Sequence, residues 1–342
     1  MKQKHIKLFI FGSTGDLVKR KVVPAISALR GFDLTVVTLG RKDHTDQSYR
    51  NFVCDGECDE NFSDKHVYVK IDMENGVECQ DCLLHLDKKG VNYFYSALPP
   101  ANIADVVRYL GRLKRDGYRI KLLVEKPFGT SLKDAVNLKK LIAKEKMTED
   151  VLVSDHYLFK KEVMALKPRA FKKLEIVSLE KVGLERRAGY YDGVGALKDM
   201  VQSHFFNIAF RLMKNPAKSF AVPKVLVYER GQYGDGKGSG KGHDYVRDLG
   251  KPSDTETFAH VVMKAGGREF DFVTGKMFVK KTGYISIDGK TIHFNSADNP
   301  YVRLLEDFFL GKKDHFATID ESILGWKLTE AIQKKTSKLS FY

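Results

Sequence analysis

The first half of the chain alternates short apolar runs with stretches in which apolar residues recur every three or four positions. The apolar runs predict strands at 6–11, 34–39, 67–71, 91–96, 120–124 and 151–154. The periodic stretches predict helices at 16–30, 46–55, 77–89, 101–116 and 132–144. Because strands and helices alternate, we expect a parallel α/β sheet with helices on both faces. Ligands of such sheets bind beyond the carboxyl ends of the strands, so residues at those ends are the first candidates for a site.

The pattern changes after residue 154. A strand at 174–180 and a long helix at 195–213 lead into strand-like runs at 224–228, 255–263, 269–274, 284–287 and 291–294. Two helices follow, near 301–309 and 321–334. Strands in series predict an α+β domain with a mainly antiparallel sheet. We therefore predict two domains, 1–154 and 155–342.

The composition is that of a folded protein that acts on small molecules. Of the 342 residues, 43% are hydrophobic and 11% aromatic, which is enough for a substantial core. No apolar run approaches the roughly 20 residues that span a bilayer, and the short apolar run at 6–11 predicts a strand rather than a signal peptide. We expect a cytoplasmic protein without a membrane partner. The net charge of +14 is spread along the chain, which favours phosphorylated small molecules over nucleic acid.

All four cysteines lie in one short segment. Cys54 and Cys58 have C-x3-C spacing, and Cys79 and Cys82 have C-x2-C spacing. This pattern is compatible with a zinc site. We prefer the simpler interpretation, four reduced thiols on two surface helices, because the surrounding segments have the pattern of ordinary strand–helix units.

The turn after the first predicted strand is suited to an anion. In "FIFGSTGDLVKRK", residues 9–21, two glycines permit a tight turn and two hydroxyls add donors. The N–H groups and dipole of the helix that follows attract a pyrophosphate. The turn lacks the G-x-G-x-x-G spacing of the usual Rossmann fingerprint. The cofactor-binding candidates here are Gly12, Ser13, Thr14, Gly15, Asp16 and Leu17.

The end of the second predicted strand, "LGRKD", distinguishes between dinucleotides. NAD sites usually place an acidic residue here, where it accepts from the ribose 2′-hydroxyl. This chain has Arg41, and a guanidinium suits the 2′-phosphate of NADP. Three later segments, "YSALPP", "VEKPFGTSL" and "VSDHYLFKKEV", end the fourth, fifth and sixth strands. They add four cofactor candidates, Ala97, Leu98, Glu125 and Lys126, and three residues that could hold a phosphate, His156, Tyr157 and Lys160.

These motifs together resemble the glucose-6-phosphate dehydrogenase family. The resemblance rests on "GSTGDLVKRKVVPA", "FYSALPP", "EKPFGTS", "SDHYLFKKEV", "RAGYYDGVGALKDMVQSH", "ETFAHVVMK", "TGKMFVKKTG" and the closing "NPYVRLLEDFFLGKKDHFATIDESILGW". It covers nearly the whole chain, and it implies a Rossmann-type NADP-binding domain followed by an α+β substrate domain. The family's own turn is G-x-x-G-D-L, so no glycine is missing from "GSTGDL".

The resemblance implies oxidation of glucose 6-phosphate to 6-phosphogluconolactone, with hydride transfer to NADP. His204 matches the general base and Asp155 its acidic partner. We do not expect Asp199 to be that partner, because residues five apart on an α-helix are about 140° apart. The residues that match substrate ligands are Lys126, His156, Tyr157, Lys160, Glu180, Asp199, Lys276 and Lys281. No metal is implied.

The chain departs from the family pattern at three places. Phe159 replaces a small residue beside the expected phosphate site, and Lys281 stands where many members have Arg. A deletion between Ala297 and Asp298 removes strands that in the family help to form the dimer face and, in some members, a second NADP site. We therefore expect one NADP per chain and a monomer or small homo-oligomer.

Two other functions fit parts of the pattern. A sugar dehydrogenase of the glucose–fructose oxidoreductase type shares the "EKP" lysine, but it usually has G-x-G-x-x-G and an Asp and a His with three residues between them. Here four residues lie between Asp199 and His204. A non-catalytic NADP sensor is expected to lack His204, Asp155 or Lys126, and this chain has all three.

Overall fold

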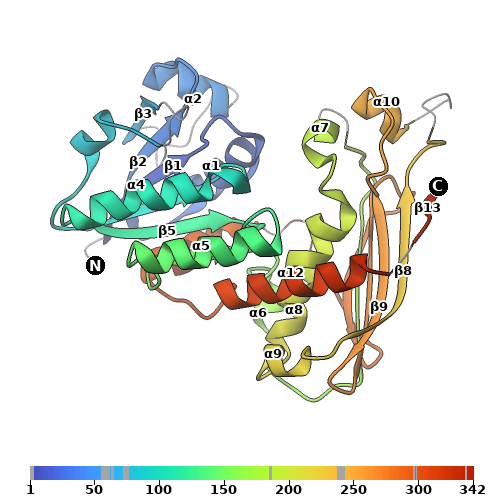
Figure 1. The fold of residues 1–342 in the computed structure, drawn as a ribbon. Coiled ribbons are helices and arrows are strands. Elements are labelled where there is room, and N and C mark those ends of the chain that lie inside the picture. Colours follow the sequence, from blue (N-terminus) through green and yellow to red (C-terminus); the bar gives the residue numbers. More distant parts are fainter. Residues whose placement is uncertain are drawn as a thin grey trace. The chain divides into compact units, whose positions relative to one another are not determined.

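The computed structural model describes residues 4–54, 62, 65–71, 77–184, 187–236, 243–295, 297, 299–335 and 337–342. The chain forms two compact units (Figure 1). The first comprises Met1–Phe159 and Asp298–Ile319, and the second comprises Lys160–Ala297 and Asp320–Tyr342. The prediction from sequence divided the chain once, at 154/155. The structure differs because 298–319 returns to the first unit.

The first unit is built on a parallel sheet of six strands. The strands are β1 (Lys4–Phe11), β2 (Phe32–Gly40), β3 (His66–Lys70), β4 (Val91–Ser96), β5 (Arg119–Glu125) and β6 (Val151–Ser154), in the spatial order β3-β2-β1-β4-β5-β6. Every neighbouring pair is parallel, which confirms the predicted sheet. The order reverses between β1 and β4, and ligands of such sheets bind at that switch point.

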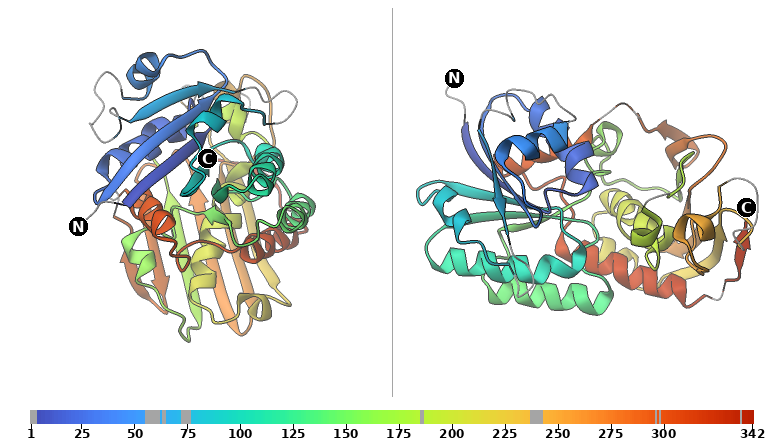
Figure 2. Two further views of the ribbon diagram at one scale, coloured as in Figure 1. Left: turned by 90° about the vertical axis from the view of Figure 1, so that its left-hand side faces the viewer. Right: turned by 90° about the horizontal axis from the view of Figure 1, so that it is seen from above.

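Helices cover both faces of this sheet. Figure 2 shows α4 (Ile103–Arg115) and α5 (Leu132–Lys144) on one face, and α1 (Val23–Ala28) with α11 (Pro300–Leu310) on the other. Helix α2 (Asp46–Cys54) and the short 3-10 turn η3 (Pro100–Asn102) complete the unit. In the core between β1 and β4, the rings of Phe9 and Phe94 stack 4.7 Å apart.

Helix α11 belongs to the first unit because its end is bonded to the first sheet. Lys4 Nζ and Tyr93 Oη donate to the carbonyl of Phe309, at 2.5 and 3.1 Å. Local sequence sets its ends: the Asn299 side chain caps the first turn, and Gly311, with φ of 71°, stops the helix.

The predicted helix at 77–89 is wrong. Only the 3-10 turn η2 (Asp81–His85) forms there, and Leu83 and Leu84 are 44% and 82% exposed. The buried residues of the segment are instead Val77, Cys79 and Cys82. Val77 and Cys79 are two positions apart, which is not the spacing of one helix face, so a helix here would gain little from packing.

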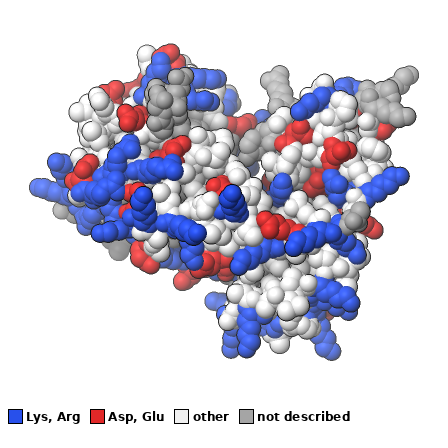
Figure 3. Space-filling view, viewed as in Figure 1, with Lys and Arg blue, Asp and Glu red and all other residues white. Residues whose placement is uncertain are grey.

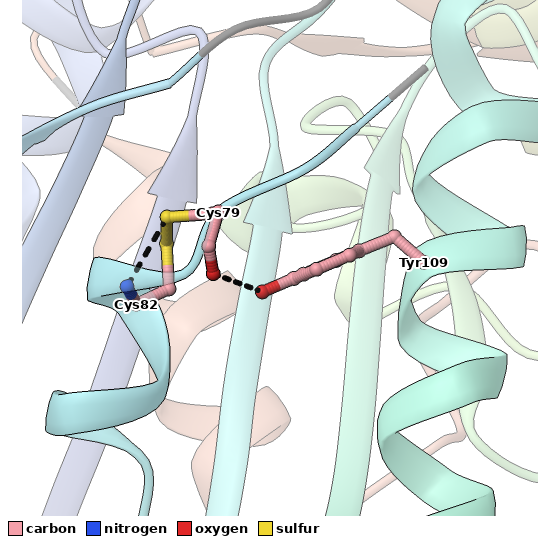
Figure 4. The surroundings of a disulfide bond; sticks show 3 residues. All are labelled: Cys79, Cys82 and Tyr109. Atoms are coloured by element: carbon pink, nitrogen blue, oxygen red, sulfur yellow. Dashed lines mark hydrogen bonds between the residues drawn. A yellow bond between two sulfur atoms is a disulfide. The ribbon is translucent and has the colours of Figure 1, made fainter. Parts of the chain in front are cut away.

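The same segment contains a disulfide, so the prediction of four reduced thiols is wrong. Cys79 and Cys82 are bonded, with their Cα atoms 5.3 Å apart (Figure 4). The C-x2-C spacing closes a single turn, in which the Cys82 N–H donates to Cys79 Sγ at 3.2 Å. Tyr109 Oη from α4 donates to the Cys79 carbonyl at 3.3 Å. Cys54 is also disulfide-bonded, and Cys58 lies outside the described residues.

The second unit is built on a mixed sheet of seven strands. The strands are β7 (Lys173–Leu179), β8 (Lys224–Gln232), β9 (Phe258–Ala265), β10 (Arg268–Gly275), β11 (Thr282–Ile287), β12 (Lys290–His293) and β13 (Leu339–Phe341), in the order β12-β11-β7-β10-β9-β8-β13. Four pairings are antiparallel, which confirms the mainly antiparallel prediction. The pairs β7–β10 and β8–β13 are parallel.

The helices of this unit are mostly short. They are α6 (Lys161–Met164), α7 (Ala188–Tyr191), α8 (Phe206–Arg211), α9 (Pro216–Ser219), α10 (Tyr245–Leu249) and α12 (Ile319–Gln333). The predicted helix at 195–213 is a π-helix, η5 (Leu197–Phe205), that continues into α8. Helix α12 packs closely on η5, because a Cβ at Gly325 would lie 2.4 Å from the Gln202 carbonyl oxygen. A second π-helical turn, η1 (Val18–Val22), opens the helical segment after β1 in the first unit.

On one face of the molecule, the basic residues form several groups rather than one stripe (Figure 3). On the face shown in Figure 3, Lys and Arg side chains are interleaved with Asp and Glu. At one edge of the second sheet, β12 carries exposed Lys290 and His293. Charged side chains of this kind protect an open edge from pairing with another strand.

Candidate functional site

The glycine turn after β1 packs tightly against the loop after β4. Gly12 has φ of +75°, and the Gly15 N–H closes the turn on the Gly12 carbonyl at 3.0 Å. A Cβ at Gly12 would lie 3.0 Å from the Ala97 carbonyl oxygen and 3.1 Å from Leu98 Cδ2. Only glycine therefore fits. Three of the predicted cofactor residues meet here, at the sheet's switch point.

The rest of the turn opens into a helix whose first N–H groups have no acceptor within the helix. Asp16 is exposed and pairs with Arg20 at 2.7 Å, while Leu17 directly precedes η1. Ser13 is fully buried, its N–H donates to the Leu39 carbonyl at 3.1 Å, and its hydroxyl has no partner among the described residues. Thr14 is half-buried. The Ser13 side chain is therefore enclosed in the turn, whereas the Thr14 side chain is partly accessible.

Arg41 lies beside this turn at the end of β2. It is exposed, and its neighbour Gly40 touches the turn: a Cβ there would lie 3.2 Å from Ser13 Oγ. The following residues are fixed, since the Lys42 carbonyl accepts from Tyr68 Oη at 2.5 Å and Asp43 pairs with Lys70 at 2.6 Å. The backbone next to Arg41 is thus hydrogen-bonded, and the Arg41 side chain is exposed.

Glu125, at the end of β5, is partly buried, and two hydroxyl groups bond to its carboxyl group. Tyr95 Oη donates to Glu125 Oε1, and Ser154 Oγ donates to the same oxygen at 3.2 Å. Burial raises the pKa of Glu125 to about 7, although these hydrogen bonds and the charge of Lys126 oppose the rise. Burial and the Glu125 charge also hold the pKa of Tyr301 well above its usual value. The carboxyl therefore lies in a shell of hydroxyl groups next to the predicted site lysine.

Asp155 and His156 follow β6 in the first unit. Asp155 is fully buried, and its carboxylate accepts from the Tyr157 N–H at 3.0 Å. The ring of His156 stacks on Tyr301 at 5.5 Å with an angle of 17°. Both groups are therefore held in fixed orientations by their own unit.

Phe159 packs in the core of the first unit. Its ring lies 4.8 Å from that of Phe316 and 6.0 Å from His315, and its carbonyl accepts from Arg303 Nε at 2.8 Å. The large side chain thus fills a core position.

In the second unit, three predicted substrate ligands form one cluster. Lys276 follows β10 and is only 7% exposed. Its ammonium lies 2.9 Å from Glu180 Oε2 and 4.0 Å from Asp199 Oδ2. Lys281 is exposed before β11, and no described contact joins it to this cluster. Lys160, at the start of α6, has its ammonium 5.4 Å from the Phe294 ring.

His204 and Asp199 share the π-helix η5, which changes the geometry expected from sequence. A π-helix closes its hydrogen bonds between residues five apart, so the two residues lie on the same side of η5. The argument from a 140° rotation on an α-helix was therefore wrong. The two residues differ in their surroundings. The Asp199 carboxylate lies 4.0 Å from the Lys276 ammonium, and the His204 side chain is buried.

The sequence did not single out the tyrosines that surround these groups. Tyr95, Tyr301, Tyr191 and Tyr342 each contact a predicted site residue or interact with it electrostatically. Only Tyr95 had a signal, its place at the end of a strand. The contacts of Tyr342 depend on strand pairing across the second sheet, which no local pattern reveals.

Two family models together match residues 9–227 of the chain. "Glucose-6-phosphate dehydrogenase, NAD binding domain" matches residues 9–165, and "Glucose-6-phosphate dehydrogenase, C-terminal domain" matches residues 164–227. No described helix is both long and apolar enough to cross a membrane.

Curated relatives of this chain are named glucose-6-phosphate 1-dehydrogenase. Glucose-6-phosphate 1-dehydrogenase of Rhizobium meliloti is 32% identical, over 86% of this chain and 72% of that protein. The Bacillus subtilis protein of that name is 30% identical, over 86% of this chain and 73% of its own length.

Solved structures share the fold. A glucose-6-phosphate dehydrogenase in complex with glucose 6-phosphate aligns with a TM-score of 0.80 and 19% identity, over 100% of this chain and 96% of that chain. The Mycobacterium avium enzyme aligns at 0.77 and 21%, over 98% of this chain and 94% of that chain. The WlbA dehydrogenase of Thermus thermophilus aligns at 0.62 and 15%, over 98% of this chain and 96% of that chain. By the family models and the relatives, the chain belongs to the glucose-6-phosphate dehydrogenase family.

Proposed function

We propose that this protein oxidises glucose 6-phosphate at C1 to 6-phosphogluconolactone and reduces NADP. The observation that carries the proposal is a cluster of three predicted ligands in the second unit, in which the Lys276 ammonium lies 2.9 Å from Glu180 Oε2 and 4.0 Å from Asp199 Oδ2. One ammonium between two carboxylates is suited to a sugar, because it offers both donors and acceptors to hydroxyl groups.

The first unit supports NADP as the cofactor. The glycine turn, closed against Ala97, leaves the first-turn N–H groups for a pyrophosphate, and Arg41 is exposed beside it for a 2′-phosphate. NADP supplies the acceptor for the hydride that leaves C1. The residues that would hold it are Gly12, Thr14, Arg41, Leu98 and Lys126.

The protein's own part in the reaction is proton transfer and positioning. His204 takes the proton of the C1 hydroxyl while the C1–H electron pair leaves as hydride, so that a C=O bond forms in the lactone. Asp155 orients and stabilises the imidazolium. His156, Tyr157 and Lys160 would bind the phosphate, and Lys126 would contact both the sugar and the cofactor. Alignment of the two reactants supplies most of the remaining rate enhancement.

We also propose that the protein works in the cytoplasm as a monomer or small homo-oligomer, with no nucleic acid or membrane partner. A charged sugar phosphate does not cross a bilayer unaided, so its enzyme is expected in the compartment that contains it. The deletion after Ala297 removes part of the surface that pairs subunits in the family.

The test is formation of NADPH, followed by absorbance, from NADP and each of glucose 6-phosphate, glucose and fructose 6-phosphate. The proposal predicts turnover of glucose 6-phosphate and little reaction with glucose, which lacks the phosphate. Binding of NADP without turnover of any sugar would favour a sensor. Turnover of unphosphorylated sugars alone would favour the oxidoreductase alternative.

A further inference from the structure

The backbone of Lys276 is held on both sides of the residue. Its N–H donates to the Thr257 carbonyl at 3.0 Å, and its carbonyl accepts from Tyr342 Oη at 2.8 Å. Its ammonium lies 6.0 Å from the centre of the Tyr191 ring, besides its contacts with Glu180 and Asp199. A long lysine side chain is flexible by itself, so these contacts fix where its charge lies.

Tyr342 is anchored at its backbone and at its ring. It follows β13, its N–H donates to the Gln232 carbonyl at 3.1 Å, and its carbonyl accepts from the Gly234 N–H at 2.9 Å. Its ring lies 5.1 Å from that of Phe278 and 6.0 Å from that of Phe258.

The hydroxyl of Tyr342 is the part that reaches Lys276. It also lies 3.0 Å from Thr257 Oγ1, so it bridges two segments, Thr257 before β9 and Lys276 after β10. A tyrosine hydroxyl is protonated at neutral pH, so it can donate to the Lys276 carbonyl. Tyr342 is 42% exposed as a residue, and the two hydrogen bonds of its hydroxyl are partly buried.

We propose that Tyr342 is a positioning residue for substrate binding: its hydroxyl fixes the Lys276 backbone, so that the lysine ammonium meets the sugar phosphate together with Glu180 and Asp199. This inference rests on the proposed function. It goes beyond it by assigning a role to a residue 66 positions away from Lys276 in the chain.

The variant that isolates the hydroxyl is Tyr342→Phe, which keeps the ring between Phe258 and Phe278. Loss of one neutral hydrogen bond, with a carbonyl left unpaired, should raise KM for glucose 6-phosphate by about 3- to 10-fold. We expect kcat to stay within about twofold and KM for NADP to be unchanged, because the hydroxyl contacts neither reactant. The matched control is Tyr284→Phe, which removes a hydroxyl that bonds Glu175 in the same sheet, and it should change none of these constants.

A double-mutant cycle tests whether the effect passes through the lysine. Lys276→Ala should raise KM by more than Tyr342→Phe, and adding Tyr342→Phe to Lys276→Ala should raise it no further. Circular dichroism checks that each variant is folded. The more disruptive Tyr342→Leu should raise KM at least as much as Tyr342→Phe.

The outcomes separate the two proposals. If Lys276→Ala raises KM and Tyr342→Phe does not, the positioning role is wrong and the proposed function stands. The positioning role is also wrong if the two effects are additive, because Tyr342 then acts independently of Lys276. If the wild type forms no NADPH, the proposed function is wrong. Calorimetric binding of glucose 6-phosphate then decides the role of Tyr342, which requires the same 3- to 10-fold loss of affinity in Tyr342→Phe.

Discussion

The partly buried carboxyl of Glu125 should make the stability of the first unit depend on pH. The pKa of this group is about 7 in the folded protein, because of burial, against a model value of 4.5 for the unfolded chain. Below pH 4.5 both states are protonated. Between pH 4.5 and 7 the folded state keeps a proton that the unfolded chain releases, so rising pH favours unfolding. At about 1.4 kcal/mol for each unit of pH, the full loss above pH 7 is about 3 kcal/mol.

Glu125→Gln removes this titration while keeping an oxygen that accepts from Tyr95 and Ser154. The free energy of unfolding is measured from urea titrations followed by far-UV circular dichroism at pH 5, 6, 7 and 8. Between pH 5 and pH 8, the wild type should lose about 2.5 kcal/mol relative to the variant. The prediction concerns how the difference in free energy of unfolding between the two proteins changes with pH. It does not concern the size of that difference at pH 5.

The single tryptophan provides an internal control. Trp326 lies on α12 in the second unit, which does not contain Glu125. Where the units unfold in separate transitions, Trp326 fluorescence should show the same pH dependence in both proteins. Parallel wild-type and Glu125→Gln curves by circular dichroism would show that Glu125 is ionised throughout and that burial does not control its pKa.

Three further predictions concern catalysis, the cofactor and assembly. His204→Asn should lower kcat by about 10²- to 10⁴-fold while glucose 6-phosphate still binds, because the variant keeps the shape and loses the base; steady-state kinetics with near-normal kcat would rule out His204. Arg41→Ala should weaken the binding of NADP by about 1.5–3 kcal/mol and the binding of NAD much less; equal weakening of both in calorimetric titrations would mean that Arg41 is structural or that Lys42 binds the 2′-phosphate. Light scattering with an NADP titration should give one NADP per chain and a monomer or small dimer; two NADP per chain, or a stable dimer paired through the sheet faces, would contradict the effect assigned to the deletion.

The first sheet could be predicted because its strands are buried on both faces and therefore appear as continuous apolar runs. The predicted ends of β4 and β6, Val91–Ser96 and Val151–Ser154, match the structure. The helix at 77–89 was wrong because an apolar stripe predicts a helix only if it is buried, and Leu84 is 82% exposed. The place of α11 was missed for a related reason: an amphipathic pattern shows that a helix packs, but not on which sheet.

Some site residues could likewise be found from the sequence pattern, and others could not. Residues at strand ends, such as Gly12, Arg41 and Glu125, could be found because a parallel sheet brings its carboxyl ends to one edge. The cluster of Lys276 with Glu180 and Asp199 was implied by motifs, but its geometry depends on pairing between β7 and β10. The π-helix that carries Asp199 and His204 has no sequence signal comparable to a cap or a proline, so the α-helical rotation was the wrong guide.

The central claim, that the protein moves a hydride from C1 of glucose 6-phosphate to NADP, is tested most directly by isotope transfer. The protein is mixed with NADP and glucose 6-phosphate deuterated at C1, and the reduced cofactor is analysed by mass spectrometry. We expect reduced NADP that carries one deuterium per molecule, formed in step with the lactone or its hydrolysis product. Reduced cofactor without deuterium would place the oxidation at another carbon, and no reduced cofactor would contradict the claim altogether.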